Sequence, residues 1–331
     1  MKKYLVIQTA SIGDVILSTA IGEKLKATDK NCQVDYLIKK GNEGVFYGNM
    51  DINELFIWDK RQDKYKNMLR IIFQIREENY DAVINLQRFF SSGVFTVFSG
   101  AKKKFGFKKN PLSLFFSQRF DHKFKENWHE IDRNHQLIKG ITDEKAAMPK
   151  LYPTKKEYAK MSPYKTQAYI TITPASLWYT KQYPKEKWLE FINQVDENTN
   201  IFLLGSGADA DLCEKIIGES KRKNIMNLAG KLTFVESAAL MRDALMNYVN
   251  DSAAQHIASS VNGKLSSIFC STVSDFGFGP LSTDSVIIES KEKLNCRPCG
   301  LHGHKNCPEG HFKCALNIDT QDLINRLNHA N

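Results

Sequence analysis

The sequence lacks any uninterrupted apolar run of the roughly 18 residues that a membrane-spanning helix needs. Its start, Met1-Lys2-Lys3, leads directly into an apolar stretch without a small-residue cleavage site, so we expect no signal peptide. It also contains no short-period repeat and no low-complexity tract. The cysteines number seven, an odd count that favours free thiols in a reducing compartment. Together these absences predict a cytoplasmic globular protein.

Two common phosphate-binding motifs are also missing. The segment LLGSGADADL (203–212) has glycines after an apolar run, but it has neither a complete G-x-G-x-x-G pattern nor a following Walker lysine. This excludes the dinucleotide fingerprint and the P-loop. What the segment does offer is Asp209 or Asp211 as an acceptor for the hydroxyl groups of a ribose.

The chain has 331 residues, which favours two domains, and its 42% hydrophobic and 25% charged residues are typical of a globular protein. Strand-like and helix-like patterns alternate along the first half, lapse around 148–165, where prolines and lysines gather, and then restart. Such alternation is typical of βαβ units and a parallel sheet. We therefore predict two doubly wound α/β domains, 1–155 and 156–331, with the last helix a candidate for packing back on the first. Expected strands are 3–9, 33–38, 54–58, 81–86, 168–174, 200–207, 245–250 and 264–270, and expected helices are 14–27, 64–79, 126–140, 185–195, 209–220, 233–244 and 251–261.

A net charge of +9 is concentrated partly in KKKFGFKKNPLSLFF (102–116), where lysines precede phenylalanines and leucines. Three interpretations fit this pattern, in decreasing order of preference. The first is a solvated basic loop followed by a buried helix. The second is a surface that binds an anionic membrane, and the third is a nucleic-acid site.

A single carboxylate, Asp14, lies where the first expected strand turns into the first expected helix. It can stabilise the first turn of that helix, because a carboxylate there meets free N–H groups and the positive end of the helix dipole. It can also face a substrate, because ligands of open α/β sheets bind at the carboxyl ends of the strands.

The second half offers a site for a diphosphate. In NYVNDSAAQHIASS (247–260) a strand ends at Asn250 and a helix follows Asp251 and Ser252, so the exposed N–H groups of its first turn can bind an anion. His256 lies one turn into that helix, where a packed histidine and a ligand-binding one are equally compatible with the pattern. Lys181, ahead of a helix that starts with proline, can supply a counter-ion for phosphate oxygens.

In these motifs and their order the chain resembles glycosyltransferase family 9, the ADP-heptose:lipopolysaccharide heptosyltransferases. The resemblance extends over essentially the whole chain, and no single motif decides it. It is carried by SIGDVILSTA (11–20), YDAVINLQ (80–87), WHEIDRN (128–134), TKQYPKEKW (180–188), NLAGKLTFVESAALM (227–241), NDSAAQH (250–256) and CRPCGLHGHKNCPEGHFKC (296–314).

The resemblance implies a GT-B fold, in which two Rossmann-like domains face each other across a cleft. It also implies inverting transfer of heptose from ADP-L-glycero-D-manno-heptose to the inner core of lipopolysaccharide, with no cofactor required. Asp14 takes the role of general base. The acceptor-binding residues are expected to be Ser11, Gly13, Gln87 and Arg88, and the donor-binding residues Thr180, Lys181, Asp209, Asp251, Ser252, Ala253, His256 and Thr272.

Three departures from the family pattern stand out. Gln8 takes the place of a lysine that often follows the first strand, and Ala253 takes the place of a glycine. The segment 269–277 stands where a Gly-Pro-Thr turn is common and leaves Thr272 as the match. The expected partners are the nucleotide sugar, a lipid A–Kdo acceptor and, transiently, an anionic membrane. We expect a monomer at the inner face of the inner membrane.

The cysteine-rich segment raises a separate hypothesis. A C-x₂-C pair with two further cysteines is a signature of structural zinc, with Cys296, Cys299, Cys307 and Cys314 as ligands. The tight spacing argues against this structural zinc site. The resembled family needs no metal for catalysis, so we expect no catalytic metal. Two functional alternatives remain: a family member that uses another nucleotide sugar, and a non-catalytic ADP-sugar-binding protein. A basic nucleic-acid binder built on 102–109 and 296–314 is a third class, and we expect no nucleic-acid partner.

Overall fold

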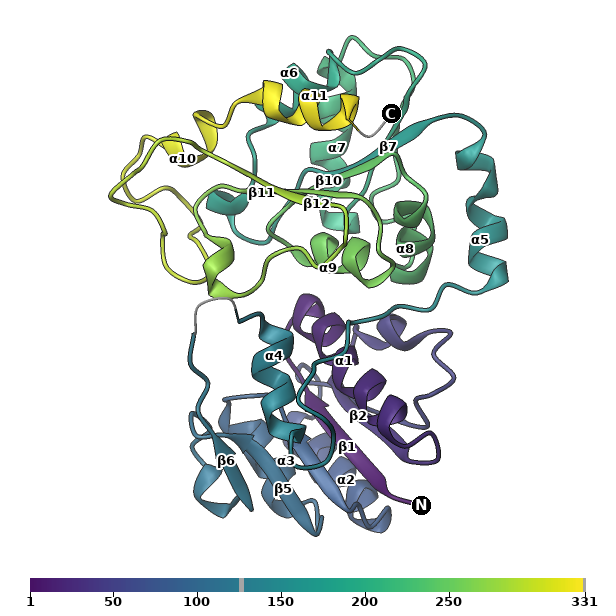
Figure 1. The fold of residues 1–331 in the computed structure, drawn as a ribbon, viewed down its shortest axis with the longest axis vertical. Helices are drawn as coiled ribbons and strands as arrows, with labels where there is room; N and C mark the ends of the chain where they lie inside the picture. The colour runs from purple at the N-terminus through teal and green to yellow at the C-terminus, as the bar shows by residue number, and fades with distance from the viewer. Residues whose placement is uncertain (125–127, 330–331) are drawn as a thin grey trace. The chain divides into compact units, whose positions relative to one another are not determined.

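A computed structural model describes residues 1–124 and 128–329 of the chain. These residues form two compact units that divide between Tyr152 and Pro153, close to the predicted boundary after residue 155. Each unit is built on a six-stranded sheet in which every pair of neighbouring strands is parallel (Figure 1). The predicted α/β fold class with two doubly wound units is confirmed.

The first unit has the strand order β3-β2-β1-β4-β5-β6. Helices α1 and α4 pack together on one side of the sheet, whereas α2 and α3 pack on the other (Figure 1). The strands are β1 Lys3–Gln8, β2 Gln33–Lys39, β3 Leu55–Trp58, β4 Ala82–Asn85, β5 Lys103–Phe107 and β6 Gln118–Phe120, and the helices are α1 Ile12–Thr28, α2 Lys64–Glu77, α3 Phe90–Phe98 and α4 Glu130–His135.

The second unit repeats the plan with the order β12-β11-β10-β7-β8-β9. Its strands are β7 Tyr169–Thr173, β8 Asn200–Leu203, β9 Ile225–Asn227, β10 Met246–Asn250, β11 Leu265–Phe269 and β12 Ser285–Glu289. Its helices are α5 Lys155–Met161, α6 Lys185–Ile192, α7 Ala210–Glu219, α8 Phe234–Arg242, α9 Ala253–Ser260, α10 Lys313–Leu316 and α11 Thr320–Asn328.

Burial explains why these segments are strands. Every residue of β7, β10 and β11 is buried, because a parallel sheet covered by helices on both faces presents no solvent side. Each unit has a separate apolar core. The order of connection reverses between β1 and β4 in the first sheet and between β7 and β10 in the second, and such reversal points are where open α/β sheets bind ligands.

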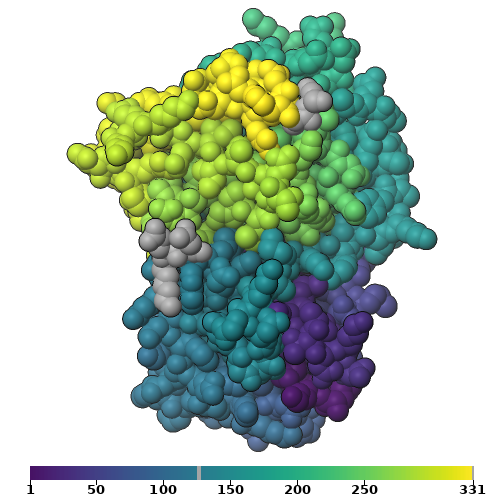
Figure 2. All heavy atoms as spheres, in the orientation of Figure 1, coloured from purple at the N-terminus to yellow at the C-terminus, as the bar shows by residue number. Residues whose placement is uncertain are grey.

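The C-terminal helix packs on the second unit. Leu323 and Leu327 of α11 belong to the core of the second unit, and the hydroxyl of Tyr248 donates a hydrogen bond to the carbonyl of Leu323 at 2.9 Å. Figure 2 shows this segment, in yellow, on the outside of the second unit.

The basic stretch 102–116 differs from the predicted loop. Its segment Lys-Lys-Phe-Gly-Phe (103–107) forms β5, and Phe105 and Phe107 are buried, with 4% and 1% of their surface exposed. Lys102 forms an ion pair with Asp81 at 2.7 Å. The expected buried helix after the loop is a short helical turn, Ser113–Phe115, of which Leu114 and Phe115 are exposed. The strand was missed because its two lysines were interpreted by their charge, and the buried residues 105–107 come only at its end.

Residues 126 and 127 of the predicted helix 126–140 lie outside the described residues. In the rest of that range, α4 covers Glu130–His135 and a short helical turn, Gln136–Ile138, follows it. Among the described residues, the structure contains no helix that is both long and apolar enough to cross a bilayer.

Candidate active site

Asp14 lies in the first turn of α1, directly after the carboxyl end of β1. The residue that caps the helix is Ser11, whose backbone is extended and whose hydroxyl donates a hydrogen bond to the carboxylate of Asp14. Asp14 is partly exposed. The two interpretations of Asp14 are therefore compatible: its carboxylate adds to the stability of the first turn, and its partly exposed side chain lies at the edge where open α/β sheets bind ligands.

Two glutamine side chains lie beside this turn. Gln8 ends β1, Gln87 follows β4, and the amide of Gln87 donates a hydrogen bond to the side-chain oxygen of Gln8. Both are buried, at 2% and 7% exposure. Because β1 and β4 are neighbours in the sheet, the structure brings the predicted acceptor residues Ser11, Gly13 and Gln87 to adjoining strand ends. Arg88 is exposed, and its guanidinium lies 5.4 Å from the ring of Phe89.

A lysine that the sequence reasoning missed also reaches this edge. Lys60 follows β3, and its ammonium donates a hydrogen bond to the carbonyl of Thr9 at 2.7 Å. Burial, and then the charges of Lys39 and Lys64, lower the pKa of Lys60 below its usual value. Lys60 therefore places a cation beside the loop after β1, where the family pattern has a lysine in the position of Gln8. The signal in the sequence was its position just after a predicted strand.

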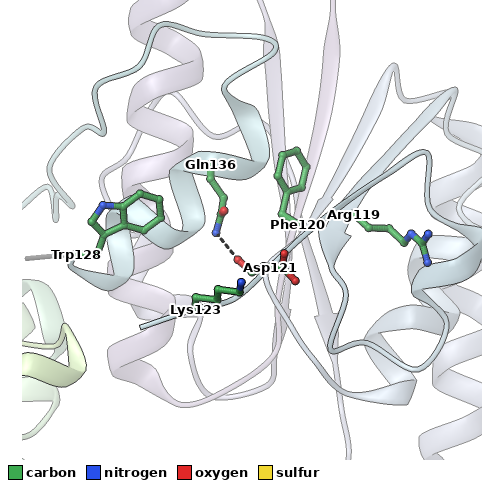
Figure 3. Close-up of a pocket in the computed structure, with 6 residues that line it drawn as sticks. All are labelled: Arg119, Phe120, Asp121, Lys123, Trp128 and Gln136. Carbon is green, nitrogen blue, oxygen red and sulfur yellow. Dashed lines mark hydrogen bonds between the residues drawn. The ribbon is translucent and has the colours of Figure 1, made fainter. Parts of the chain in front are cut away.

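The first unit also holds a hollow of about 320 Å³ at the carboxyl end of β6 (Figure 3). Its lining includes the cations Arg119 and Lys123 and the ring of Trp128. Gln136 donates a hydrogen bond to the main-chain carbonyl of Asp121 at 3.1 Å, which fixes one wall (Figure 3). Its polar and aromatic lining suits a carbohydrate or an anion better than an apolar ligand.

The motif at 128–134 has a structural role. Arg133 is fully buried, and its guanidinium donates to Glu130 at 2.6 Å and to the carbonyl of Trp128 at 3.1 Å. Burial raises the pKa of Glu130, but the hydrogen bond from His122 and the charge of Arg133 outweigh it and hold that pKa below its usual value. The motif thus anchors the start of α4 beside the hollow.

In the second unit, three of the predicted donor residues, Lys181, Asp251 and Thr272, meet at neighbouring strand ends. The ammonium of Lys181, in the loop after β7, lies 2.6 Å from the carboxylate of Asp251, which follows β10. The hydroxyl of Thr272, after β11, donates to the same carboxylate oxygen at 2.6 Å. The side chains of Lys181 and Asp251 are only 15% and 10% exposed. A cation, an anion and a hydroxyl therefore meet at the carboxyl edge of the sheet.

The start of α9 has hydrogen-bonding capacity to spare. Ser252 is its N-cap residue, but its hydroxyl makes no capping bond and, within the described part of the chain, has no hydrogen-bond partner although the atom is buried. The hydroxyl of Thr173, at the end of the neighbouring β7, is likewise buried and has no hydrogen-bond partner among the described residues. Buried polar groups are usually paired, so both hydroxyls suit a ligand at this edge. Ala253 is the first residue of α9, and His256 is buried one turn further on.

Asn250 positions the loop that carries Lys181. Its amide donates to the carbonyl of Pro174 at 2.8 Å and its side-chain oxygen accepts from the N–H of Tyr183 at 2.9 Å. The sequence reasoning read Asn250 only as the end of a strand. Since Asn250 is fully buried, this pair of bonds fixes both ends of the loop to β10.

Thr180 faces the C-terminal segment and not the open edge. Its hydroxyl accepts hydrogen bonds from the N–H of His304 at 2.8 Å and from the hydroxyl of Ser271 at 3.0 Å, and it donates to the carbonyl of His304 at 3.3 Å. A hydroxyl has one proton and two lone pairs, so this one is fully engaged. Gly303 permits the approach, since a Cβ there would lie 2.8 Å from the hydroxyl of Thr180. The geometry gives Thr180 a role in holding Lys181 in place.

The loop after β8 is held by its own hydrogen bonds. The carboxylate of Asp209 accepts from the N–H and the hydroxyl of Ser206, both at 2.7 Å. The loop after β9 crosses closely, since a Cβ on Gly230 would lie 2.7 Å from the Cα of Gly207, and Gly230 has a φ of +75° that favours glycine. Asp209 therefore has a local structural role, and its predicted contact with a ribose stays a prediction.

The cysteine-rich segment contacts the loops after β7 and β11. Cys296 Sγ lies 3.9 Å from Nε2 of His311, and Arg297 donates to the carbonyl of Thr272 at 2.8 Å. Burial, followed by the charges of the neighbouring cysteines, raises the pKa of Cys314 to about 11. In residues 1–124 and 128–329 no group of three or more histidine, cysteine, aspartate or glutamate side chains has a geometry that could hold a metal ion, so the zinc hypothesis for Cys296, Cys299, Cys307 and Cys314 gains no support.

Comparison with known proteins assigns the family. The model of glycosyltransferase family 9 (heptosyltransferase) matches residues 68–311, which is most of the chain. The chain belongs to glycosyltransferase family 9. It is therefore a glycosyltransferase of the heptosyltransferase type, and the resemblance noted in the sequence is confirmed.

Curated relatives and solved structures agree with this assignment. The chain is 25% identical to lipopolysaccharide heptosyltransferase 1 of Campylobacter coli, with 97% of each chain covered. It is 27% identical to lipopolysaccharide heptosyltransferase 3 of Escherichia coli K12, with 83% and 84% covered. Its fold matches that of E. coli ADP-heptose lipopolysaccharide heptosyltransferase II with a TM-score of 0.83 at 19% identity, covering 100% and 98% of the two chains.

Proposed function

We propose that this family 9 enzyme transfers heptose from ADP-L-glycero-D-manno-heptose to an inner-core sugar of lipopolysaccharide, with inversion at the anomeric carbon. The binding of the donor is supported by the side chains at the carboxyl edge of the second sheet. There Lys181 is held at the end of β7, and the start of α9 offers a buried, unpartnered Ser252 hydroxyl among the described residues. Cation, hydroxyl and free N–H groups together are what a diphosphate requires.

The chemistry assigned to Asp14 follows from a single displacement. A hydroxyl of the acceptor attacks the anomeric carbon of heptose on the face opposite the diphosphate, and its proton passes to the carboxylate of Asp14. The bond between the sugar and the diphosphate breaks, and its electron pair leaves with ADP. Lys181 and the N–H groups at the start of α9 balance the charge that develops on the leaving group. No metal ion is part of this proposal.

The acceptor half is proposed for the first unit. Ser11, Gly13 and Gln87 lie at adjoining strand ends with Asp14, and Arg88 and Lys60 add positive charge there. Positive charge suits the phosphate and carboxylate groups of a lipid A–Kdo acceptor. Because that acceptor is a lipid, we propose a cytoplasmic monomer that associates peripherally with the inner face of the inner membrane.

The test is a transfer assay with purified enzyme, ADP-heptose and lipid A–Kdo. The expected result is release of ADP and a gain in acceptor mass of one heptose, with an inverted anomeric configuration by NMR. ADP-glucose and a UDP-sugar are assayed in parallel as alternative donors. Turnover with one of these and not with ADP-heptose would assign another donor, and binding of ADP-heptose without ADP release would make the protein a non-catalytic ADP-sugar binder.

A further inference from the structure

Helices α2 and α3 carry five large apolar side chains in solvent. The exposed fractions are 72% for Tyr65, 58% for Leu69, 64% for Phe73, 60% for Phe90 and 54% for Phe98. The three on α2 recur every fourth residue and so lie in one line along the helix. These side chains are not needed for the core, because a different face of α2, with Met68, Ile71, Ile72 and Ile75, is already buried against the sheet.

The two helices adjoin. The guanidinium of Arg76 near the end of α2 donates to the carbonyl of Phe98 at the end of α3, at 3.3 Å. We call the exposed side of α2 and α3 the α2/α3 face. Monomeric proteins rarely expose large apolar patches, and those that do use them to bind partners or membranes.

The apolar surface continues to the edge that carries Asp14. Asn110 donates to the carbonyl of Phe89, just before α3, at 3.0 Å, and this bond holds the turn that follows Asn110 against the start of the helix. That turn exposes Leu114 and Phe115, at 76% and 65%. Both α2 and α3 begin at the carboxyl edge of the first sheet.

The positive charge on α2 indicates that the partner of this face is anionic. The helix carries Lys64, Lys66, Arg70 and Arg76 against one acid, Glu77, and the ion pairs of the described residues include none made by Lys64, Lys66 or Arg70. A helix with an apolar line bordered by unpaired cations is typical of one that lies in the surface of an anionic bilayer.

We propose that the α2/α3 face is the surface through which this protein lies on an anionic lipid bilayer. The apolar line of Tyr65, Leu69 and Phe73 enters the headgroup region, and Lys66 and Arg70 meet the lipid phosphates. Because both helices start at the edge that bears Asp14, this orientation keeps that edge next to the headgroups. The inference rests on the proposed function, in which the acceptor is a lipid, and it assigns the docking to α2 and not to the basic residues at the start of β5.

The experiment is co-sedimentation of the full chain with vesicles of phosphatidylethanolamine and phosphatidylglycerol at low salt. We expect binding that falls with added salt and is weak on phosphatidylcholine vesicles. Leu69→Ser with Phe73→Ser should weaken binding by about tenfold or more, since two large apolar side chains no longer enter the lipid. Lys66→Gln with Arg70→Gln should weaken it by about tenfold as well.

Two matched controls make the result specific. Lys102→Gln with Lys103→Gln removes the same charge from the start of β5, and Met50→Ser removes an apolar side chain that is 95% exposed elsewhere on the unit. Both should bind as the unmutated chain does. Equal loss in a control, no binding by the unmutated chain, or self-association through the α2/α3 face would each overturn the proposal. Transfer to a water-soluble, delipidated acceptor tests the function separately and should survive in every variant.

Discussion

The ion pair between Lys181 and Asp251 allows a quantitative test of the donor site. With 2.6 Å between ammonium and carboxylate, Coulomb's law gives about 6 kcal/mol of attraction at an effective dielectric constant of about 20. Most of this offsets the cost of removing both charges from water. Removing one partner of such a buried pair costs about 3 to 5 kcal/mol, because the other charge stays buried and unpaired. Both side chains are at most 15% exposed, so solvent screens the pair little.

We therefore expect Lys181→Met and Asp251→Asn each to lower the free energy of unfolding by about 3 kcal/mol, and the double variant to lower it no further than the worse single one. Calorimetry should show that Lys181→Met weakens ADP binding by about 1.5 to 3 kcal/mol, whereas Asp251→Asn, which keeps the cation, changes it much less. Lys185→Met is the control, because Lys185 forms an exposed pair with Glu219 at the same 2.6 Å and should cost under about 1 kcal/mol. Strictly additive effects of the two single changes would refute the coupling.

Three further predictions concern catalysis, pH and metal. Asp14→Asn should lower turnover by about 100-fold and leave ADP affinity unchanged, and near-normal initial rates would remove Asp14 as the base. Burial lowers the pKa of His135 from 6.5, so the unfolded chain binds the proton more readily. The contribution of neutral His135 to the free energy of unfolding should therefore be complete above about pH 6.5 and be lost as the pH falls through the lowered pKa of the folded state. Denaturant titrations at several pH values should show this dependence, and His135→Gln should flatten it. Prolonged treatment with EDTA should leave the transfer rate unchanged, and loss restored by a divalent ion would contradict the metal-free proposal.

The alternation of strand and helix patterns in the sequence predicted the two α/β units and the positions of most of their strand-to-helix transitions. The strand-to-helix transitions at Asp14 and at Asp251 were readable because a buried strand, a cap residue and an apolar helical segment follow one another within about twenty residues. β5 was missed because the lysines at its start were interpreted by charge, although the aromatic pair Phe105 and Phe107 that the strand buries was present in the sequence.

The missing parts of the site depend on contacts between distant segments. The donor role expected of Thr180 stays a prediction, and the sequence did not show that its hydroxyl bonds to His304, which is 124 positions away. Lys60 reaches the loop after β1 from β3, two strands across the sheet, and no spacing rule links residues 51 positions apart. Sequence reasoning recovered which residue types the chemistry needs. It grouped Lys181, Asp251 and Thr272 correctly, but it could not recover the contacts that Thr180 and Lys60 make with distant segments.

The division of the chain into two units with separate cores has an evolutionary consequence. The residues proposed for the nucleotide all lie in the second unit, from Thr173 to Thr272, and those proposed for the acceptor lie in the first, up to Arg88. A change in the first sheet's loops can therefore alter which sugar hydroxyl is modified without disturbing the core that supports the donor loops. Relatives that extend different acceptors with one activated sugar can arise by drift in half of the gene, and chimeras joined near Tyr152 are the natural unit for exchanging acceptor preference between them.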